Sequence, residues 1–348
     1  MVEMVYDRGF STTLEQLGLS IAVSTYKASK VFSLWGEGGK VVRHEASVPR
    51  AMGVGFEQDM MVVATQGGMS MYRRVGRFPG VKEADRNYDN VWVERAKYLT
   101  GPIDTHDVGI VDKRIIAVNT AWSCIGVFGF EESFQPIWKP PFVSKLGPGD
   151  RCHLNGMAMV DGAPKYVTAL GQTDEPRLWK ESIVDGGVLM DVESNEVLLE
   201  GLAMPHSPAW NEEEGCLYFL ESAIGALSRY FPESGKHEIV MKTDRFVRGL
   251  AIHGEVAFMG FSKLRESSST FRLLHGKLSG ECAGVLAVDM ASGKSLGVLE
   301  FEEGIDELYD VSFFPVEGRH IVLSEWDAKM QPHLVLQDKL IFLKRKEA

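Results

Sequence analysis

Residues 106–121, HDVGIVDKRIIAVNTA, hold two short apolar runs joined by a turn, and the second run ends in small polar residues. Runs of this kind recur at intervals of roughly fifty residues, which is the period of a β-propeller whose four-stranded blades bury their faces against one another. The pattern therefore predicts an all-β fold, a single propeller around a central channel. The second runs are Ile21–Tyr26, Met60–Gln66, Ile115–Ala121, Tyr166–Gly171, Leu217–Ser222, Val256–Ser262 and Ile321–Glu325.

A shorter apolar strand precedes most of these runs and is the candidate for the innermost strand of each blade. Small residues follow the first position in several copies, as expected where strands crowd around an axis. Seven second strands favour seven four-stranded antiparallel blades, and six clear first strands also allow six. The first strands begin at Arg50, His106, Asn155, Ser207, Arg248 and Tyr309.

The ends of the chain are expected to complete the ring. Residues 1–19 form a lead-in, partly helical over Thr12–Leu19, and residues 20–348 form the propeller. A strand from the far terminus should close the first blade, and the tail His333–Arg345 could supply it or could finish a blade of its own. Longer insertions are predicted to be loops over one face, at about residues 74–103, 131–152, 172–186 and 263–283.

Composition excludes several classes of partner. The formal charge of −11 would repel phosphate backbones and anionic membrane surfaces, so neither nucleic acid nor a membrane is an expected partner. The N-terminus lacks the character of a secretory signal, and no apolar run is long enough to cross a bilayer. The four cysteines lack metal-site spacing and should be reduced, mostly buried thiols. These features predict a soluble, cytoplasmic protein.

Three histidines open successive innermost strands, in DTHD, CHLNG and MPHSP. Innermost strands start at the face where second strands end, so His106, His153 and His206 should approach one another at one mouth of the channel. Three imidazoles that leave an open position are typical of a catalytic divalent-metal site. Alternatively, each histidine bonds to the backbone of a neighbouring blade.

Other polar residues gather at the same predicted mouth. Arg50 and Arg248 could bind the carboxylate of a ligand, or could form ion pairs with acidic neighbours. Tyr309 could donate a proton or cap the channel, and Asn155 could be a ligand or a turn former. The candidates for proton transfer are thus Glu221, Tyr309 and Asp310, and the candidates for substrate binding are Arg50, Arg248, Asn155, Asp107 and Thr168.

Familiar cofactor and nucleophile motifs are missing. The chain has no GxxxxGK[ST] phosphate loop, no GxGxxG after a strand, no HExxH helix and no GxSxG elbow. No nucleotide cofactor is therefore expected.

The chain resembles an uncharacterised bacterial β-propeller family known as a domain of unknown function. Matching stretches run in order from about residue 20 to 312, and the more specific ones are RCHLNG, YVTALGQTD and MPHSP. More distantly, it is similar to metal-dependent lactonases and strictosidine-synthase-like propellers, which hold a divalent cation on carboxylate and amide oxygens. Glu221 and Asn155 could serve in that way. The histidines depart from that pattern and favour zinc or iron over calcium.

Two main hypotheses follow. In the first, the protein is an enzyme for a small anionic metabolite, metal-assisted, with hydrolase or lyase chemistry preferred over isomerisation. In the second, the propeller is a scaffold for a protein partner, and the histidines are structural. A sensor that binds a ligand without turnover is a third possibility.

Overall fold

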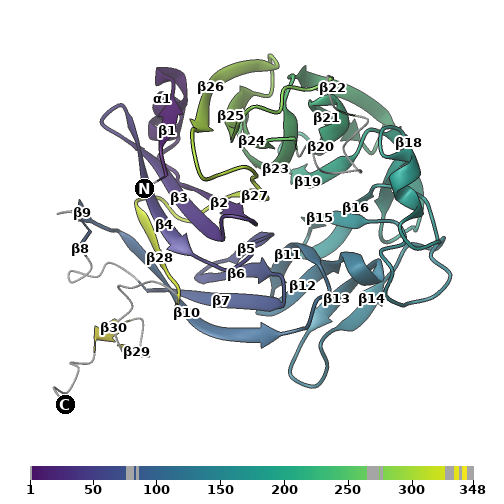
Figure 1. Ribbon diagram of the computed structural model, residues 1–348, viewed down its shortest axis with the longest axis horizontal. Helices are drawn as coiled ribbons and strands as arrows, with labels where there is room; N and C mark the ends of the chain where they lie inside the picture. Colours follow the sequence, from purple (N-terminus) through teal and green to yellow (C-terminus); the bar gives the residue numbers. More distant parts are fainter. Residues whose placement is uncertain are drawn as a thin grey trace.

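Six sheets surround one axis in the computed structural model, which describes residues 2–75, 82–83, 86–264, 274, 277–325, 333–336 and 339–342 (Figure 1). Each sheet is one blade, and its strands run outward from the axis. Within the described residues the ring has six blades, the smaller of the two counts that the sequence allowed.

Among the first three blades, blades 1 and 2 combine strands from both ends of the chain. Blade 1 has β27 (Asp310–Phe313), β2 (Ile21–Thr25), β3 (Lys30–Glu37) and β4 (Lys40–Ser47). Blade 2 has β5 (Val54–Glu57), β6 (Met60–Thr65), β7 (Gly68–Val75), β10 (Asn90–Leu99) and β28 (His320–Leu323). Blade 3 has β11 (Thr105–Val111), β12 (Arg114–Asn119), β13 (Cys124–Phe128) and β14 (Gln135–Trp138).

The other three blades follow in chain order, and blade 6 also contains a strand from the N-terminus. Blade 4 has β15 (Leu154–Val160), β16 (Ala163–Ala169), β17 (Gly187–Asp191) and β18 (Val197–Leu202). Blade 5 has β19 (Pro205–Asn211), β20 (Cys216–Glu221), β21 (Ala226–Phe231) and β22 (Lys236–Lys242). Blade 6 has β23 (Phe246–His253), β24 (Val256–Ser262), β25 (Ala283–Asp289), β26 (Lys294–Phe301) and β1 (Met4–Tyr6). Two separate hairpins pair β8 (Lys82–Glu83) with β9 (Arg86–Asn87), and β29 (His333–Leu336) with β30 (Lys339–Phe342).

A strand from the far terminus closes the ring, as predicted, but it is not the predicted tail. β27 is the innermost strand of blade 1 and pairs antiparallel with β2. The run read as a seventh second strand, Ile321–Glu325, instead contributes β28, which pairs in parallel with β10 at the outer edge of blade 2. The described part of the tail, β29 and β30, pairs only with itself. Seven apolar runs therefore build six blades.

Blade-to-blade packing explains why the strands are apolar on both faces. Side chains alternate along a strand, so each inner strand presents one set to each neighbouring blade. In β20, Leu217 and Phe219 pack toward blade 4, whereas Tyr218 and Leu220 pack toward blade 6. Every pair of adjacent blades has an apolar cluster of this kind.

Hydroxyl groups near the ends of the second strands join each blade to the next. Thr120 Oγ1 donates to the carbonyl oxygen of Leu154 at 2.6 Å, and Ser222 Oγ donates to that of Val247 at 2.6 Å. Ser24 and Ser262 make equivalent bonds to Met52 and Leu308. The small polar residues at the ends of the second apolar runs therefore donate hydrogen bonds to backbone carbonyls next to the axis.

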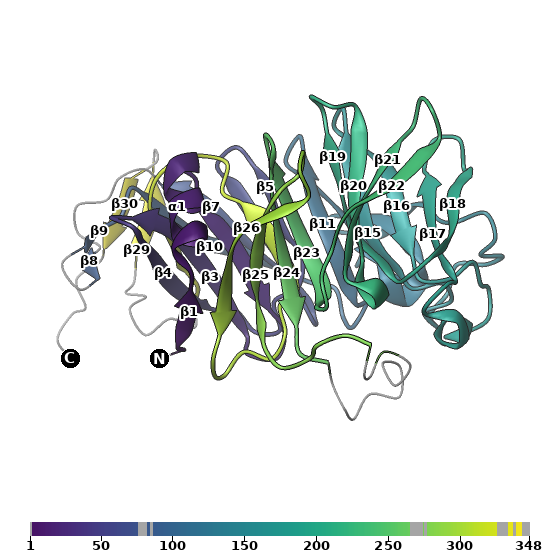
Figure 2. The same cartoon turned by 90° about the horizontal axis from the view of Figure 1, so that it is seen from above.

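The N-terminal lead-in packs against the side of the ring. α1 (Arg8–Leu17) begins after Asp7, whose carboxylate accepts the Phe10 amide, and ends at Gly18 in the left-handed conformation. The helix buries Phe10 and Leu14 between blades 6 and 1, where Phe10 meets Phe258 edge to face. Figure 2 shows α1 and β1 beside this part of the ring.

The predicted loops are partly strands. β10 and β14 lie within the insertions at residues 74–103 and 131–152 and form outer strands of blades 2 and 3. The insertion at 172–186 contains a short 3₁₀ helix, Leu178–Ser182, and much of the one at 263–283 lies outside the described residues. Across the described chain, no helix has the length and hydropathy needed to cross a bilayer.

Candidate functional site at the channel mouth

Two layers of side chains line the channel where the innermost strands begin. We call them the first and second layers, by consecutive positions in the six aligned strands. The first layer is Met52, His106, Asn155, His206, Arg248 and Tyr309, and the second layer is Gly53, Asp107, Gly156, Ser207, Gly249 and Asp310.

Close contacts between neighbouring blades support this alignment. A Cβ atom on Gly53 would lie 3.0 Å from the Cα atom of Asp107, and one on Gly249 would lie 3.0 Å from that of Asp310. Asp107 Oδ2 accepts the Met157 amide of the next blade at 2.9 Å. The second layer is therefore tightly packed, with glycine where backbones approach most closely.

The two layers separate two chambers. The outer chamber, of about 300 Å³, includes Asp104, His153 and Trp179 in its lining. The inner chamber, of about 110 Å³, includes Asp107, Asn155 and Asp310. Four first-layer residues line both chambers: His106, His206, Arg248 and Tyr309.

The structure brings the three predicted histidines to this mouth. The ring centres of His106 and His153 lie 4.8 Å apart, and His206 lines the same outer chamber. His106 and His206 occupy equivalent first-layer positions, whereas His153 precedes its first-layer residue, Asn155, by two. The trio thus meets in one chamber although it does not share one repeat position.

Each imidazole has a partner for its Nδ1 atom. Nδ1 of His106 lies 3.0 Å from the Asp104 carbonyl, and Nδ1 of His206 lies 2.9 Å from the Met204 carbonyl. A carbonyl oxygen can only accept, so both histidines carry their proton on Nδ1 and leave Nε2 as a lone pair. Burial is the main reason that the pKa of His106 falls to about 4, and it also lowers the pKa of His206 well below its ordinary value. Both imidazoles are neutral at physiological pH.

His153 forms a pair with a carboxylate that the sequence did not reveal. Its Nδ1 atom lies 2.9 Å from Oδ2 of Asp150, and its ring lies 4.2 Å from that of Trp179. Asp150 and His153 have φ angles of 51° and 52°, a conformation that costs energy for non-glycine residues and often marks functional sites. The loops that supply Asp150 and Trp179 lack the repeat pattern, which is why they were missed.

Arg248 carries its charge into the channel without a carboxylate partner. Its guanidinium carbon lies 3.7 Å from the centre of the Tyr309 ring, and among the described residues it forms no ion pair. The Tyr309 hydroxyl is buried and makes no hydrogen bond of good geometry within the described part of the chain. Burial raises the pKa of Tyr309, so this hydroxyl stays a neutral donor. Arg50, in contrast, is exposed on the rim, with its guanidinium 5.0 Å from the centre of the Tyr26 ring.

The two second-layer aspartates are buried acids. Asp107 Oδ1 and Oδ2 accept the Val108 and Met157 amides, and Asp310 Oδ1 and Oδ2 accept the Val311 and Val54 amides. Burial raises the pKa of Asp107 to about 6. Burial, with a smaller contribution from the charge of Asp107, raises that of Asp310 to about 7.

Glu221, a predicted site residue, forms hydrogen bonds with nearby groups and lies away from the chambers. Glu221 lines neither chamber; it accepts the Ala203 amide at 3.0 Å and the Ser228 hydroxyl at 2.7 Å. Burial alone would raise the pKa of Glu221, but the His237 imidazole, 3.5 Å from Oε1, and the bonds from Ala203 and Ser228 hold it below its ordinary value.

Thr168 and Asn155 connect blades 4 and 5. Thr168 Oγ1 donates to Asn155 Oδ1 at 2.7 Å, and Asn155 Nδ2 donates to the Pro205 carbonyl at 3.0 Å. Thr168 lines neither chamber, whereas Asn155 lines the inner one. Both polar side chains therefore position the channel wall.

No set of three or more His, Cys, Asp or Glu side chains is placed to hold a metal ion in the described part of the chain. The three histidines meet, but Arg248 lies in the same ring of residues as two of them, and its charge helps to lower the pKa of both. A fixed positive charge there opposes a divalent cation and favours an anion.

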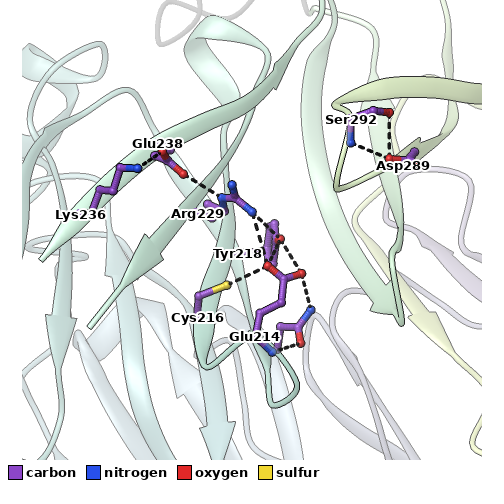
Figure 3. Close-up of polar contacts among 9 residues, drawn as sticks. Glu214, Cys216, Tyr218, Arg229, Lys236, Glu238, Asp289 and Ser292 are labelled. Atoms are coloured by element: carbon purple, nitrogen blue, oxygen red, sulfur yellow. Dashed lines mark hydrogen bonds and ion pairs between the residues drawn. The ribbon is translucent and has the colours of Figure 1, made fainter. Parts of the chain in front are cut away.

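A second polar cluster, away from the mouth, is fully paired. Figure 3 shows Arg229 between Glu214 and Tyr218 on one side and Glu238 on the other. Tyr218 also donates toward Glu214 at 2.9 Å, and Lys236 pairs with Glu238. These contacts hold the outer strands of blade 5 together and leave no free charge for a ligand.

The fold and site define a β-propeller with a polar channel mouth. The sequence model of a domain of unknown function, DUF4915, matches residues 8–323, so the chain belongs to this family. No curated protein sequence matches the chain. The crystal structure of a nidogen/laminin complex contains a similar chain, with a TM-score of 0.56 and 10% identity over 84% of this chain and 97% of that one. At that identity the likeness shows the fold alone.

Proposed function

We propose that the protein is an enzyme that acts on a small anionic metabolite in the outer chamber, as a hydrolase or a lyase. The observation that carries this proposal is the Asp150–His153 pair, whose imidazole lines the same chamber as the unpaired guanidinium of Arg248. A carboxylate-oriented imidazole beside a free cation is an arrangement for general base catalysis on a bound anion.

Each of four side chains has its own role in the proposed reaction. Arg248 binds the carboxylate of the substrate, and a guanidinium can do so through two parallel hydrogen bonds. His153 takes a proton at Nε2, either from water or from a carbon atom of the substrate. Asp150 holds the Nδ1 proton and stabilises the imidazolium that forms. The Tyr309 hydroxyl donates a hydrogen bond to the oxygen that gains negative charge.

A zinc or iron ion remains the alternative suggested by the sequence. It would use the Nε2 atoms of His106, His153 and His206 and would polarise the substrate or a water molecule. Because Arg248 disfavours a cation at this place, the proposed steps assign acid–base work to the protein's own side chains.

A screen of small carboxylate-bearing esters, lactones and β-substituted acids tests the proposal. We expect turnover of at least one, and a loss of about 100-fold or more in kcat for His153→Gln and Asp150→Asn. Tyr309→Phe keeps the ring under Arg248 and should lower kcat with little change in binding. His253→Gln, at an exposed site on β23, is the control. Binding without turnover would indicate a sensor, and no binding at all would contradict the proposal.

A second candidate function, a scaffold for a protein partner, has its own observation. Leu99 and Phe130 are 85% and 97% exposed, and the Phe130 ring lies against that of Tyr98 in a tilted contact, with ring centres 5.6 Å apart. Exposed apolar side chains that gather in this way are typical of interaction sites. Phe130→Ser should then abolish binding of a partner and leave any turnover unchanged.

We also infer a reducing compartment, such as the cytoplasm. All four cysteines are free, and Cys124, Cys152 and Cys216 are buried. Burial raises the pKa of each of these three thiols to about 12, which keeps them unreactive.

A further inference from the structure

Arg248 lines both chambers, and the two second-layer aspartates, Asp107 and Asp310, line the inner one without forming an ion pair with Arg248. Arg248 rests on the ring of Tyr309, and the next residue, Asp310, turns into the inner chamber with Asp107. Among the described residues, no ion pair joins either aspartate to a cation. The cation–π contact holds the guanidinium where the carboxyl groups do not reach it.

The two aspartates have acceptor capacity left. Each of their four oxygens accepts one backbone amide, and a carboxylate offers about four lone-pair sites in total. Amide bonds orient these groups but bring no full positive charge. Two buried carboxylates without an ion-pair partner are costly, and a ligand cation that pairs with them directly would offset that cost.

The Tyr309 hydroxyl is a second, independent indication of a ligand. The residue is 8% exposed, and its hydroxyl makes no hydrogen bond of good geometry in the described part of the chain. It lines both chambers, so a ligand group that passes between the layers would meet it. Buried hydroxyls without partners are rare in native proteins.

We propose that the ligand is a zwitterion of the amino-acid type, whose carboxylate lies against Arg248 and whose ammonium group lies between Asp107 and Asp310. This inference rests on the proposed anion site and specifies its ligand. The two layers are consecutive strand residues, about 3.3 Å apart along the strand, which suits one to three carbon atoms between the two charges. An inner chamber of about 110 Å³ has room for an ammonium group and its neighbouring carbon.

Calorimetric titration with matched probes tests this. β-Alanine and propionate differ by the amine, as do 4-aminobutyrate and butyrate. For the wild-type protein we expect at least one amino acid to bind about tenfold more tightly than its deaminated partner, the effect of one charged hydrogen bond. Asp107→Asn and Asp310→Asn should each remove that preference, and Arg248→Gln should weaken the binding of all four probes.

Asp104→Asn is the matched control, because Asp104 lines the outer chamber and not the inner one. If the preference disappears in Asp104→Asn and persists in the inner-chamber variants, the amine lies at the mouth and the inference is wrong. Equal binding of amino acids and plain acids, still dependent on Arg248, would overturn the zwitterion but retain the anion site. If none of the probes binds, the anion site fails as well. The wild-type comparison needs no variant to fold.

Discussion

The guanidinium carbon of Arg248 lies over the ring of Tyr309, 3.7 Å from its centre, and both side chains lie between the outer chamber and the inner one. A cation–π contact fixes a cation without neutralising its charge. Arg248 therefore keeps its full charge for an anion, while His106 and His206 beside it remain neutral lone-pair acceptors.

Replacing Arg248 should remove anion binding and leave the fold intact. We expect Arg248→Gln to abolish the rise in melting temperature that millimolar carboxylates give the wild-type protein, because about 2 kcal/mol of charged hydrogen bonding is lost. Differential scanning fluorimetry measures this directly. Arg245→Gln is a matched control, because Arg245 also lies over a ring, that of Phe261, but pairs with Glu300 at 2.8 Å. Equal losses in both variants would contradict a specific site.

Many of the residues that line the channel could be predicted from the sequence, because the repeat indicates where each strand begins. Strand starts gave His106, His206, Arg248 and Tyr309, and these four form the boundary between the chambers. Periodic β-strands carry equivalent residues to equivalent heights around an axis. The same logic correctly placed β27 as an innermost strand.

The predictions that were wrong concerned residues whose positions depend on local backbone turns and on side-chain direction. Arg50 has a φ of 51° and lies two residues before the first-layer Met52, so its side chain remains on the rim. Glu221 ends its strand near the mouth, but its side chain bonds to Ala203 and Ser228 instead of lining a chamber. Asp150 and Trp179 come from loops, where no period indicates position. The strand Ile321–Glu325 looked like the others because an outer strand can be as apolar as an inner one.

Acid should destabilise the protein through its buried histidines. Burial lowers the pKa of His106 from 6.5 in an unfolded chain to about 4 in the folded one, so the unfolded state binds more protons between those values. Stability contributed by the neutral imidazole is complete above pH 6.5 and is lost as the pH falls toward 4. The loss approaches about 3 kcal/mol for this residue.

Comparing variants separates the effect of His106 on stability from that of Asp107 and Asp310. The raised pKa values of these aspartates change the stability with pH in the opposite direction. We expect the free energy of unfolding of His106→Gln, measured in urea at several pH values, to fall less steeply between pH 6.5 and 4 than that of the wild type. His253→Gln, which changes an exposed histidine, should keep the wild-type slope. If His106→Gln also keeps that slope, the imidazole is not held neutral in the folded state.

Metal analysis separates the two accounts of the histidine cluster. We expect purified protein to contain zinc and iron well below one ion per chain, with no change in His106→Ala or His153→Ala, because Arg248 disfavours a cation beside these rings. Elemental analysis by mass spectrometry measures this. One ion per chain in the wild type, lost in both variants and retained in His253→Ala, would instead support the metal-assisted reaction.

The close approach of blade 6 to blade 1 makes Gly249 more sensitive to substitution than other glycines of the same strand and turn. Gly249 has a φ of 82°, and a Cβ atom there would lie 2.8 Å from the Val311 amide nitrogen in β27. Gly254 also has a positive φ, 53°, but a Cβ atom there would meet nothing within 4 Å. Gly254→Ala should cost about 1 kcal/mol of unfolding free energy, from the backbone conformation alone.

Gly249→Ala should cost at least about 2 kcal/mol more, because the backbone of β27 must move away from the axis as well. That displacement would shift Tyr309 and Asp310 together, so the variant should lose ligand binding along with stability. Urea unfolding with an unchanged m-value measures the first effect, and calorimetric titration measures the second. Equal costs for the two glycine variants would show that the contact between β23 and β27 does not limit the geometry of the ring.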